Sequence, residues 1–564
     1  MARAEPGEAS HTDLVRSAAA DVPAWWSRPG DPAWTPDADW GTAFPRTLAG
    51  HVRGGWTLTE PARAHGYSVF PGVFGSRSSI AWFDSVSVAR GPGAAWRGWE
   101  AAQVELAGDG GPAALPGGTL PRARGDFTYL NGTSGFEEYA LSVQRGDSLG
   151  WLRAESSSWE CGGIGPTAIS GRHSWGGTAG VARGMHTLGA AVEQRGHAAR
   201  LVSGEEQSVS GGSGYGSWEI RRGLHAFALR AGRGEDVHES FGGTLDVSRR
   251  EAERERAEIA WHHADPDLPV AARLEWSHER VTRIDTSRTG PDASALWAAV
   301  RGEGRLGDGR LELSVGAGQH QGVDRFEIAP SVAYAFVTPV FDGRLTVERV
   351  LAPVWTDLAP GQGAFLQSTW AAGLQIGARS PRLGAARLAW RMGRTRDRAV
   401  ASRAPIEELW LRRGFRVDPR RYDFGLLTGA AEWGGPTLGA GAGGFVLARR
   451  ASPAQPLVDP GHGARAWAEG GGRFFSGDLG VALRLEAAMV GPRESEASPS
   501  RRLDGYVTLG ATVTFTLVDV IVTVAGRNLE DEIHPLTWVD PSTGLEAIGA
   551  RREMVFTLTW RLFN

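Results

Sequence analysis

Candidate metal ligands gather in one short segment of the sequence. His262 and His263 lie beside Asp265 and Asp267, and imidazole and carboxylate groups are common ligands of transition metals and haem iron. Adjacent residues of a strand point to opposite faces, so the two histidines make a poor chelate. The single Cys161 excludes a cysteine metal cluster and an intramolecular disulfide. No nucleophile–base–acid constellation is discernible, so we expect no enzyme, no metal site and no bound cofactor.

A long arginine-rich stretch is a second candidate site. Arg394–Arg421 holds nine arginines against four acids, and we expect it to form a loop on the outer rim of the molecule. Such a loop can attract an anionic ligand or a lipopolysaccharide phosphate; the alternative is a charged loop that contacts only water. The arginines that we single out as candidate anion ligands are Arg394, Arg396, Arg398, Arg412 and Arg413.

Two further segments have unusual composition. Arg249–Glu258 carries charges on both faces of an expected strand, which excludes lipid contact on either face and places it beyond the membrane. Gly439–Gly444 contains four glycines. No helix follows that segment, so we interpret it as a small-residue strand that lets a neighbouring element approach closely.

The elements that must position these residues are strands. At the end of the chain, Met554, Phe556, Leu558, Trp560 and Leu562 alternate with mostly polar residues, which predicts a strand with one apolar face. The same alternation recurs over most of the last 450 or so residues. The segment Tyr506–Leu517 repeats the pattern, with apolar side chains on one face and mostly Thr or Gly on the other. Thr and Gly facing a wet lumen and aliphatic residues facing lipid indicate an outer-membrane β-barrel; the alternative is a soluble sandwich with a Thr-rich surface.

Composition agrees with a barrel and limits other functions. The chain has 564 residues, 79 Gly, 23 Trp and 22% charged residues, with a mean hydropathy of −0.25. It contains no run of 18 apolar residues, so transmembrane helices are not expected. The net charge of −4 argues against nucleic-acid binding.

Connection lengths predict how the strands are joined. Tight turns are expected at 307–309, 342–343, 380–384, 434–436, 476–478 and 518–519. Long polar loops are expected at 352–363, 394–421, 449–463, 491–503 and 527–551. Short turns on one rim and long loops on the other are typical of outer-membrane barrels, and the hairpins from Arg124 onward indicate about 22 strands.

The chain divides into two expected parts. Residues 1–118 form a Pro- and Gly-rich N-terminal domain and linker, and residues 119–564 form the barrel. No signal peptide is visible at the start of this numbering.

Several motifs resemble those of TonB-dependent receptors. Arg90-Gly91-Pro92, followed by Gly98 and a short strand, resembles the end of that family's plug domain. The segment Arg527-Asn528-Leu529 resembles its strand end before the last loop. The closing strand ends in Trp560-Arg-Leu562-Phe563, and Phe556, Leu558, Trp560, Leu562 and Phe563 are the residues we assign to barrel assembly.

This resemblance implies a barrel of about 22 strands with a plug domain in its lumen. It implies an importer of scarce ligands such as siderophores, haem, cobalamin or saccharides, located in the outer membrane. The implied partners are the TonB–ExbB–ExbD complex, the barrel assembly machinery, and lipid with lipopolysaccharide. The plug is short and no TonB box is found, so a passive porin-like or ligand-binding barrel is the alternative. An outer-membrane barrel enzyme, which would need a Ser–His pair near one rim, is a third.

Overall fold

The computed structural model consists almost entirely of β-strands. The residues described are 56–60, 63–64, 85–89, 102–107, 124–132, 137–146, 149–162, 167–201, 206–241, 247–265, 267–283, 288–354, 365–380, 384–396, 398–401, 415–418, 421–434, 437–452, 461–494, 502–532, 535–539, 546–548 and 552–562. Within these ranges no helix is long and apolar enough to cross a membrane.

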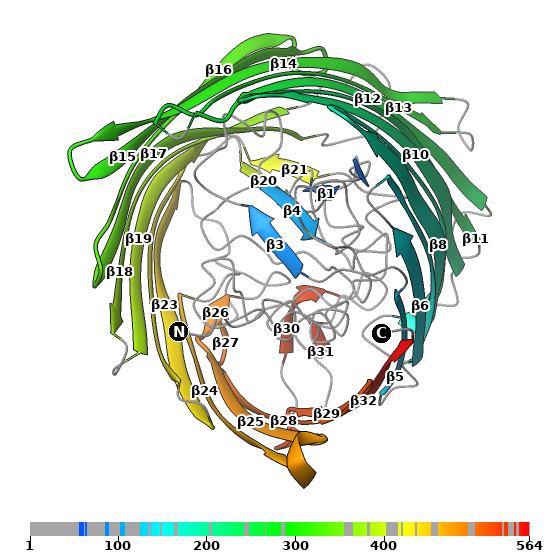
Figure 1. Cartoon of the computed structure of the whole chain (residues 1–564), viewed down its shortest axis with the longest axis vertical. Coiled ribbons are helices and arrows are strands. Elements are labelled where there is room, and N and C mark those ends of the chain that lie inside the picture. Colours follow the sequence, from blue (N-terminus) through cyan, green and yellow to red (C-terminus); the bar gives the residue numbers. More distant parts are fainter. Residues whose placement is uncertain are drawn as a thin grey trace.

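Twenty-two antiparallel strands close into one barrel (Figure 1). Each strand pairs with the next barrel strand along the chain, and the last strand pairs with the first, since Leu558 lies opposite Tyr129. Closure removes every free sheet edge, which is required of a sheet in lipid because no backbone group can be left without a partner there. The expected fold, a closed barrel of this size, is confirmed.

The barrel strands are mostly 12 to 17 residues long, which is long enough to cross a bilayer at a tilt. Their bounds are β5 (Arg124–Gly132), β6 (Glu137–Gly146), β7 (Gly150–Gly162), β8 (Thr167–Arg183), β9 (His186–Leu201), β10 (Glu206–Arg222), β11 (His225–Phe241), β12 (Val247–His263), β13 (Val270–Arg283), β14 (Arg288–Leu306), β15 (Gly309–His320), β16 (Arg325–Val337), β17 (Phe341–Val354), β18 (Phe365–Ser380), β19 (Gly384–Arg396), β22 (Arg421–Gly434), β23 (Leu438–Ser452), β24 (His462–Phe474), β25 (Leu479–Val490), β28 (Tyr506–Leu517), β29 (Val520–Arg527) and β32 (Glu553–Leu562).

Smaller sheets accompany the barrel. Before it, β1 (Trp56–Glu60), β2 (Arg63–Ala64), β3 (Ser85–Ala89) and β4 (Ala102–Ala107) form a four-stranded sheet in the order β2-β1-β4-β3. Long connections contain three hairpins: β20 (Arg398–Ala401) with β21 (Phe415–Asp418), β26 (Arg493–Glu494) with β27 (Arg502–Leu503), and β30 (Pro535–Val539) with β31 (Glu546–Ile548). Viewed down the barrel, these hairpins and the labelled strands of the N-terminal sheet fall inside the ring (Figure 1).

Connections alternate between short and long, as expected. Two residues join β14 to β15 and β28 to β29, and the 3-10 turn η6 (Phe475–Gly477) followed by Asp478 joins β24 to β25. At the other rim, 24 residues separate β19 from β22 in the sequence, from 397 to 420. We call the two ends of the barrel the turn rim and the loop rim.

The turn expected at Asp342-Gly343 is wrong by several residues. The chain reverses at Thr338–Val340, and both Asp342 and Gly343 lie within β17. The Thr338 Oγ1 accepts the Phe341 N–H at 2.8 Å, and the Thr338 N–H donates to the Phe341 carbonyl at 2.7 Å. A side-chain hydroxyl closes this turn, so it does not need the Gly that marks most tight turns.

The two faces of the strands separate as expected. On β28, Val507, Leu509 and Leu517 are exposed on the outer face, whereas Thr508, Thr512 and Thr514 are buried on the inner face, with Thr512 only 4% exposed. The closing strand β32 repeats the pattern, because Met554, Phe556 and Trp560 are exposed and Thr557 and Thr559 are buried. The apolar belt therefore lies outside the barrel.

Aromatic rings of the inner wall lie over glycines of neighbouring strands. A Cβ added at Gly318 would stand 2.8 Å from the Trp297 ring, and one at Gly180 would stand 1.9 Å from the Trp151 ring. Trp467 covers Gly441 in the same way, which confirms that the glycine-rich strand admits a neighbouring side chain. Because Gly has no side chain, a large ring can lie flat against the wall.

Candidate functional site: the inner wall of the barrel

The inner wall carries the polar chemistry of the described chain. Charged residues on β11, β12 and β13 form one network there, and residues on β24 and β25 form a second. Each arises from the two-residue period of a strand, which places residues i and i+2 on the same face.

The first network joins three arginines and two glutamates across β11–β13. The Glu275 Oε2 accepts hydrogen bonds from the Arg256 Nη2 at 2.7 Å and the Arg273 Nη2 at 2.6 Å. The Glu258 Oε1 accepts from the Arg230 Nη1 at 2.9 Å, and the Arg273 Nη1 lies 3.6 Å from the Glu258 Oε2. Strand pairing places Glu258 directly opposite Glu275, so the surrounding arginines offset a direct carboxylate–carboxylate repulsion.

The second cluster lies on β24 and β25. The Arg484 guanidinium carbon stands 4.5 Å from the centroid of the Trp467 ring, and its Nη1 donates to the Glu469 Oε2 at 3.2 Å. Glu486 pairs with Arg465 and also lies 3.7 Å from the Arg484 Nε. Cation–π and ionic contacts thus hold Arg484 in one orientation.

Other sectors of the inner wall are less charged. Near the closing strand, threonine hydroxyls approach one another across strands, with Thr514 and Thr523 Oγ1 atoms 3.2 Å apart and Thr128 and Thr559 Oγ1 atoms 3.4 Å apart. In contrast, the wall of β18 and β22–β25 carries a buried apolar cluster: Ala371, Phe424, Leu426, Phe445, Leu447 and Ala488. The inner wall is therefore divided into charged, hydroxyl-rich and apolar sectors.

This arrangement can bind and orient polar groups. Arginines held by two acids present fixed donors, and Trp467 presents an aromatic face. Within the described ranges, no group of three or more His, Cys, Asp or Glu residues could hold a metal ion. His262 and His263 occupy adjacent positions of β12 and so opposite faces of the strand; the His263 ring lies beside that of His225, with centroids 4.6 Å apart and planes tilted by 30°.

The candidate anion loop is partly strand, which corrects the expected loop start. Arg394 and Arg396 belong to β19, and Arg398 begins β20. The Arg394 Nε donates to the Asp423 Oδ1 at 2.7 Å, and these two residues lie directly opposite each other in the β19–β22 pairing. That ion pair extends the hairpin beyond the expected boundary. Arg412 and Arg413 lie outside the described residues.

The other predicted residues divide between described and undescribed parts of the chain. Arg90, Gly91, Pro92 and Gly98 lie outside the described residues, as does Phe563. Within the closing strand, Phe556, Leu558, Trp560 and Leu562 share the outer face of β32. Their predicted part in barrel assembly stays a prediction.

The predicted strand end at Asn528 has a clear structural basis. Asn528 follows the last residue of β29 and has a φ of 42°. Its Nδ2 donates to the Glu532 carbonyl at 2.7 Å, and its Oδ1 accepts the Glu532 N–H at 3.1 Å. Asn tolerates this left-handed backbone and supplies both hydrogen bonds, so it ends the strand and starts the last long connection.

The inner-wall networks are what sequence reasoning missed. They carry a signal that could have been noticed, because the tripeptide Arg-x-Glu occurs at Arg153–Glu155, Arg256–Glu258, Arg273–Glu275 and Arg484–Glu486. In a strand this spacing places both charges on one face. In the first tripeptide the Arg153 Nε lies 3.2 Å from the Glu155 Oε2, and both side chains are almost fully buried.

The outer wall shows which kind of barrel this is. Exposed side chains such as Leu274, Leu483 and Trp390 cover its mid-section. An apolar surface of this extent around a whole barrel is stable only in lipid. On β11 and β12 the outer face then becomes charged toward the loop rim, where the Arg233 Nη2 lies 3.5 Å from the Glu253 Oε2. The molecule is a transmembrane β-barrel. The run Arg249–Glu258 carries charges on both faces of β12, as expected, and its position beyond the membrane stays a prediction.

Comparison with solved structures supports this class. The FrpB iron transporter from Neisseria meningitidis matches with a TM-score of 0.72 at 10% identity, over 91% of this chain and 93% of that chain. The ferric yersiniabactin uptake receptor FyuA from Yersinia pestis matches with a TM-score of 0.68 at 13% identity, over 90% and 89%. The ferric enterobactin receptor PfeA from Pseudomonas aeruginosa matches with a TM-score of 0.73 at 10% identity, over 99% and 96%.

The fold is that of TonB-dependent receptors, as the sequence resemblance implied. No protein-family model matches the chain, and no curated protein matches it. The similar structures are receptors or transporters by name, and none is named as an enzyme.

Proposed function

We propose that the protein is an outer-membrane receptor that imports a scarce small ligand, of the siderophore, haem, cobalamin or saccharide class. The observation that carries this proposal is the closed 22-stranded barrel with an apolar outer wall and a polar inner wall. Three ferric-ligand or iron transport proteins share this architecture over about nine-tenths or more of both chains. The protein is not an enzyme in this proposal.

The N-terminal part, residues 1–118, is the plug, and residues 119–564 are the barrel. Two observations support this division. The four-stranded sheet that precedes the barrel falls inside the ring in the axial view (Figure 1). The similarity to the ferric enterobactin receptor also extends over 99% of this chain rather than over the barrel alone. Arg90, Gly91, Pro92 and Gly98 would then form the end of the plug, beside the wall.

The loop rim faces outward in this proposal, and the turn rim faces the periplasm. The hairpin β20–β21 of the long β19–β22 connection falls inside the ring in the axial view (Figure 1), and in this proposal it meets the ligand first. Arg398 at the start of β20, together with Arg396 at the end of β19, favours an anionic ligand or a lipopolysaccharide phosphate. Transport would draw energy from the TonB–ExbB–ExbD complex, and the closing strand would engage the barrel assembly machinery.

Single-channel conductance tests whether a plug seals this barrel. The full-length protein and a variant lacking residues 1–118 would be reconstituted in planar bilayers. We expect silence from the full-length protein and a large, steady conductance from the truncated one. Steady conductance from the full-length protein would contradict the receptor proposal and favour the passive porin-like barrel.

Ligand uptake in cells tests energy coupling separately. Radiolabelled ferric siderophores of several chemical types would be supplied to cells that express the protein in the presence or absence of TonB. We expect accumulation of at least one ferric siderophore to depend on TonB. Accumulation that is equal in both strains would contradict energised import while leaving the barrel and plug unaffected.

A further inference from the structure

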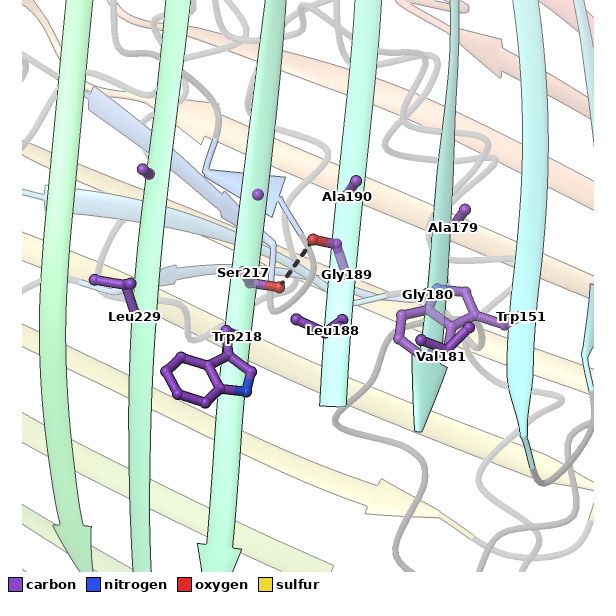
Figure 2. Close-up of a pocket in the computed structure, with 12 residues that line it drawn as sticks. Trp151, Ala179, Gly180, Val181, Leu188, Gly189, Ala190, Ser217, Trp218 and Leu229 are labelled. Carbon is purple, nitrogen blue, oxygen red and sulfur yellow. Dashed lines mark hydrogen bonds between the residues drawn. The ribbon is translucent and has the colours of Figure 1, made fainter. Parts of the chain in front are cut away.

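A groove crosses the outer wall of β8–β11 and is not part of the transport pathway. Its volume is about 700 Å³. Small residues occupy paired positions on the four strands: Ala179, Ala190, Gly216 and Ala231. The next paired row toward the turn rim is large and apolar: Val181, Leu188, Trp218 and Leu229. Figure 2 labels six of these residues on adjacent strands of the wall: Ala179, Val181, Leu188, Ala190, Trp218 and Leu229.

The wall behind the groove is closed from the lumen side. The Trp151 ring lies across Gly180, where an added Cβ would stand 1.9 Å from the ring, and approaches Gly189 as well. The Ser217 Oγ donates to the Gly189 carbonyl at 3.5 Å (Figure 2). The groove is therefore a feature of the lipid-facing surface with a continuous protein floor.

Two turns with the same sequence pattern border the groove at the turn rim. Arg183-Gly184-Met185-His186 joins β8 to β9, and Arg222-Gly223-Leu224-His225 joins β10 to β11. Gly184 and Gly223 have φ values of 62° and 58°, the left-handed region that favours glycine. Met185 and Leu224 are each 48% exposed. Each of the two turns therefore carries an exposed apolar residue at its tip, with an arginine before it and a histidine after it.

The charged residues of these turns share the face of the groove. Arg183 and Arg222 are exposed and lie an even number of residues from Val181 and Trp218, so they point to the same side. Two residues of a strand span about 7 Å, so Arg183 lies one outward position beyond Val181, whereas Arg222 lies two outward positions beyond Trp218, past Ile220. The Trp218 Nε1 donates to the His186 Nδ1 at 3.4 Å, as expected of an indole at a membrane–water boundary.

The nearest acid on β10 does not cancel this charge on the outer face. Glu219 lies on the lumen side of β10, where it pairs with Arg221. Beside other turns of the rim, outward residues include the apolar Leu306 and Phe341, and turn tips include Asp308 and Asp519; Arg145, beside the β6–β7 turn, is a further exposed outward arginine. Two outward arginines at the turn-rim ends of alternate strands above an apolar groove thus characterise β8–β11.

We propose that this surface binds one anionic glycerophospholipid from the leaflet at the turn rim. The surface comprises the groove with Arg183 and Arg222, and we call it the β8–β11 lipid site. The lipid phosphate accepts hydrogen bonds from the two guanidinium groups, and one acyl chain passes between the larger side chains and reaches the hollow over the small-residue row. Charge complementarity selects an anionic headgroup, and the apolar floor selects a lipid over a free phosphate ion.

Native mass spectrometry of the full-length protein in detergent tests this site. The probes are palmitoyl-oleoyl phosphatidylglycerol, which is anionic, and palmitoyl-oleoyl phosphatidylcholine, which is zwitterionic. We expect one tightly retained phosphatidylglycerol with an affinity about tenfold above that of phosphatidylcholine. The double variant Arg183→Gln/Arg222→Gln should remove this preference. A matched charge control is Arg387→Gln, which removes an exposed arginine from the lumen side near the turn rim and should leave the preference intact.

A second pair of variants tests the groove itself. Gly216→Leu fills the groove, and an added Cβ at Gly216 has nothing within 4 Å, so folding is not obstructed. It should weaken retention of both lipids about tenfold. Gly214→Leu is the matched control, since Gly214 lies on the same strand and face, is equally open and does not line the groove.

Three outcomes would overturn the proposal. If the unmodified protein retains the two lipids equally, the site does not select an anionic headgroup. If Gly216→Leu and Gly214→Leu weaken lipid retention equally, the groove is not where the lipid binds. Displacement of phosphatidylglycerol by lipid A, with the same dependence on Arg183 and Arg222, would reassign the site to lipopolysaccharide.

Discussion

Adjacent residues of β12 and β13 face two different solvents. Arg256, Glu258 and Arg273 point inward and form a network with side chains about one-tenth exposed or less. Ile259 and Leu274, their immediate neighbours in the sequence, point outward and are exposed. On each of these two strands, the named inward-facing side chains are charged and the named outward-facing side chains are apolar.

This difference shows what holds the barrel in place. Lipid is compatible with the outer face where that face is apolar, and the inner face of β12 and β13 tolerates buried charge because Glu258 and Glu275 are paired with arginines. A shift of one residue in register would exchange the two faces completely. The comparison can therefore be tested by single substitutions on one face or the other.

The largest effect is expected in the inner network. Glu275→Gln removes the carboxylate that accepts hydrogen bonds from Arg256 and Arg273, and leaves two buried arginines facing a neutral amide. Breaking a buried pair in this way costs about 3–5 kcal/mol. Urea unfolding of the protein in lipid vesicles, followed by tryptophan fluorescence, measures the loss. A loss below about 1 kcal/mol would mean that water reaches the network freely.

A charge on the outer wall should have the next largest effect. Leu483→Arg places a guanidinium in the apolar belt and should lower the free energy of unfolding by about 2–4 kcal/mol. The matched control is Ala482→Arg, on the same strand but on the inner face, where the native side chain is exposed. The same unfolding measurement applies. Equal losses for the two variants would contradict the assignment of the two faces.

A smaller effect is expected where an aromatic ring covers a glycine. In Gly318→Ala the new Cβ would stand 2.0 Å from the Leu296 carbonyl oxygen and 2.8 Å from the Trp297 ring. Overpacking of this kind costs about 1–3 kcal/mol. Gly425→Ala is the control, because nothing lies within 4 Å of its added Cβ. Heat-modified mobility on gels reports the folded fraction, and identical behaviour of the two variants would exclude close packing at Gly318.

The smallest effect is expected for an exposed charge pair that lies neither in the buried inner network nor on the lipid-facing belt. The Arg200 Nη2 lies 2.6 Å from the Glu206 Oε1, and both side chains are more than half exposed near the loop rim. Glu206→Gln should change the free energy of unfolding by less than about 1 kcal/mol, because water and salt screen exposed pairs. The same urea series compares it with Glu275→Gln. If Glu206→Gln lowers the free energy of unfolding as much as Glu275→Gln does, burial does not determine the cost of breaking an ion pair.

Much of the barrel was predictable from local pattern. The alternation at Val507–Leu517 and Met554–Leu562 predicts both the strands and the face of each side chain, because a strand has a period of two. Turn positions were less predictable. The turn at Thr338–Val340 is closed by a hydroxyl rather than by glycine, and β19 extends through Arg394 because Asp423 lies opposite it on another strand.

The candidate sites depended on pairing between strands and were largely missed. Arg256, Glu258 and Glu275 look like ordinary surface charges in the sequence, since nothing local indicates that Glu258 will lie opposite Glu275. The groove has the same origin. Ala179, Ala190 and Gly216 are unremarkable in isolation, and they form one row only because two hairpin registers align them.

The sequence by itself determined the kind of surface that each strand presents, because alternation is a property of neighbouring residues. It also determined where Arg-Gly-Met-His and Arg-Gly-Leu-His turns occur, because glycine with positive φ is a local requirement. Only the tertiary structure decided which charges meet inside the barrel and which small residues line up outside it. Those contacts depend on register and closure, which bring together residues far apart in the chain, such as Thr128 and Thr559.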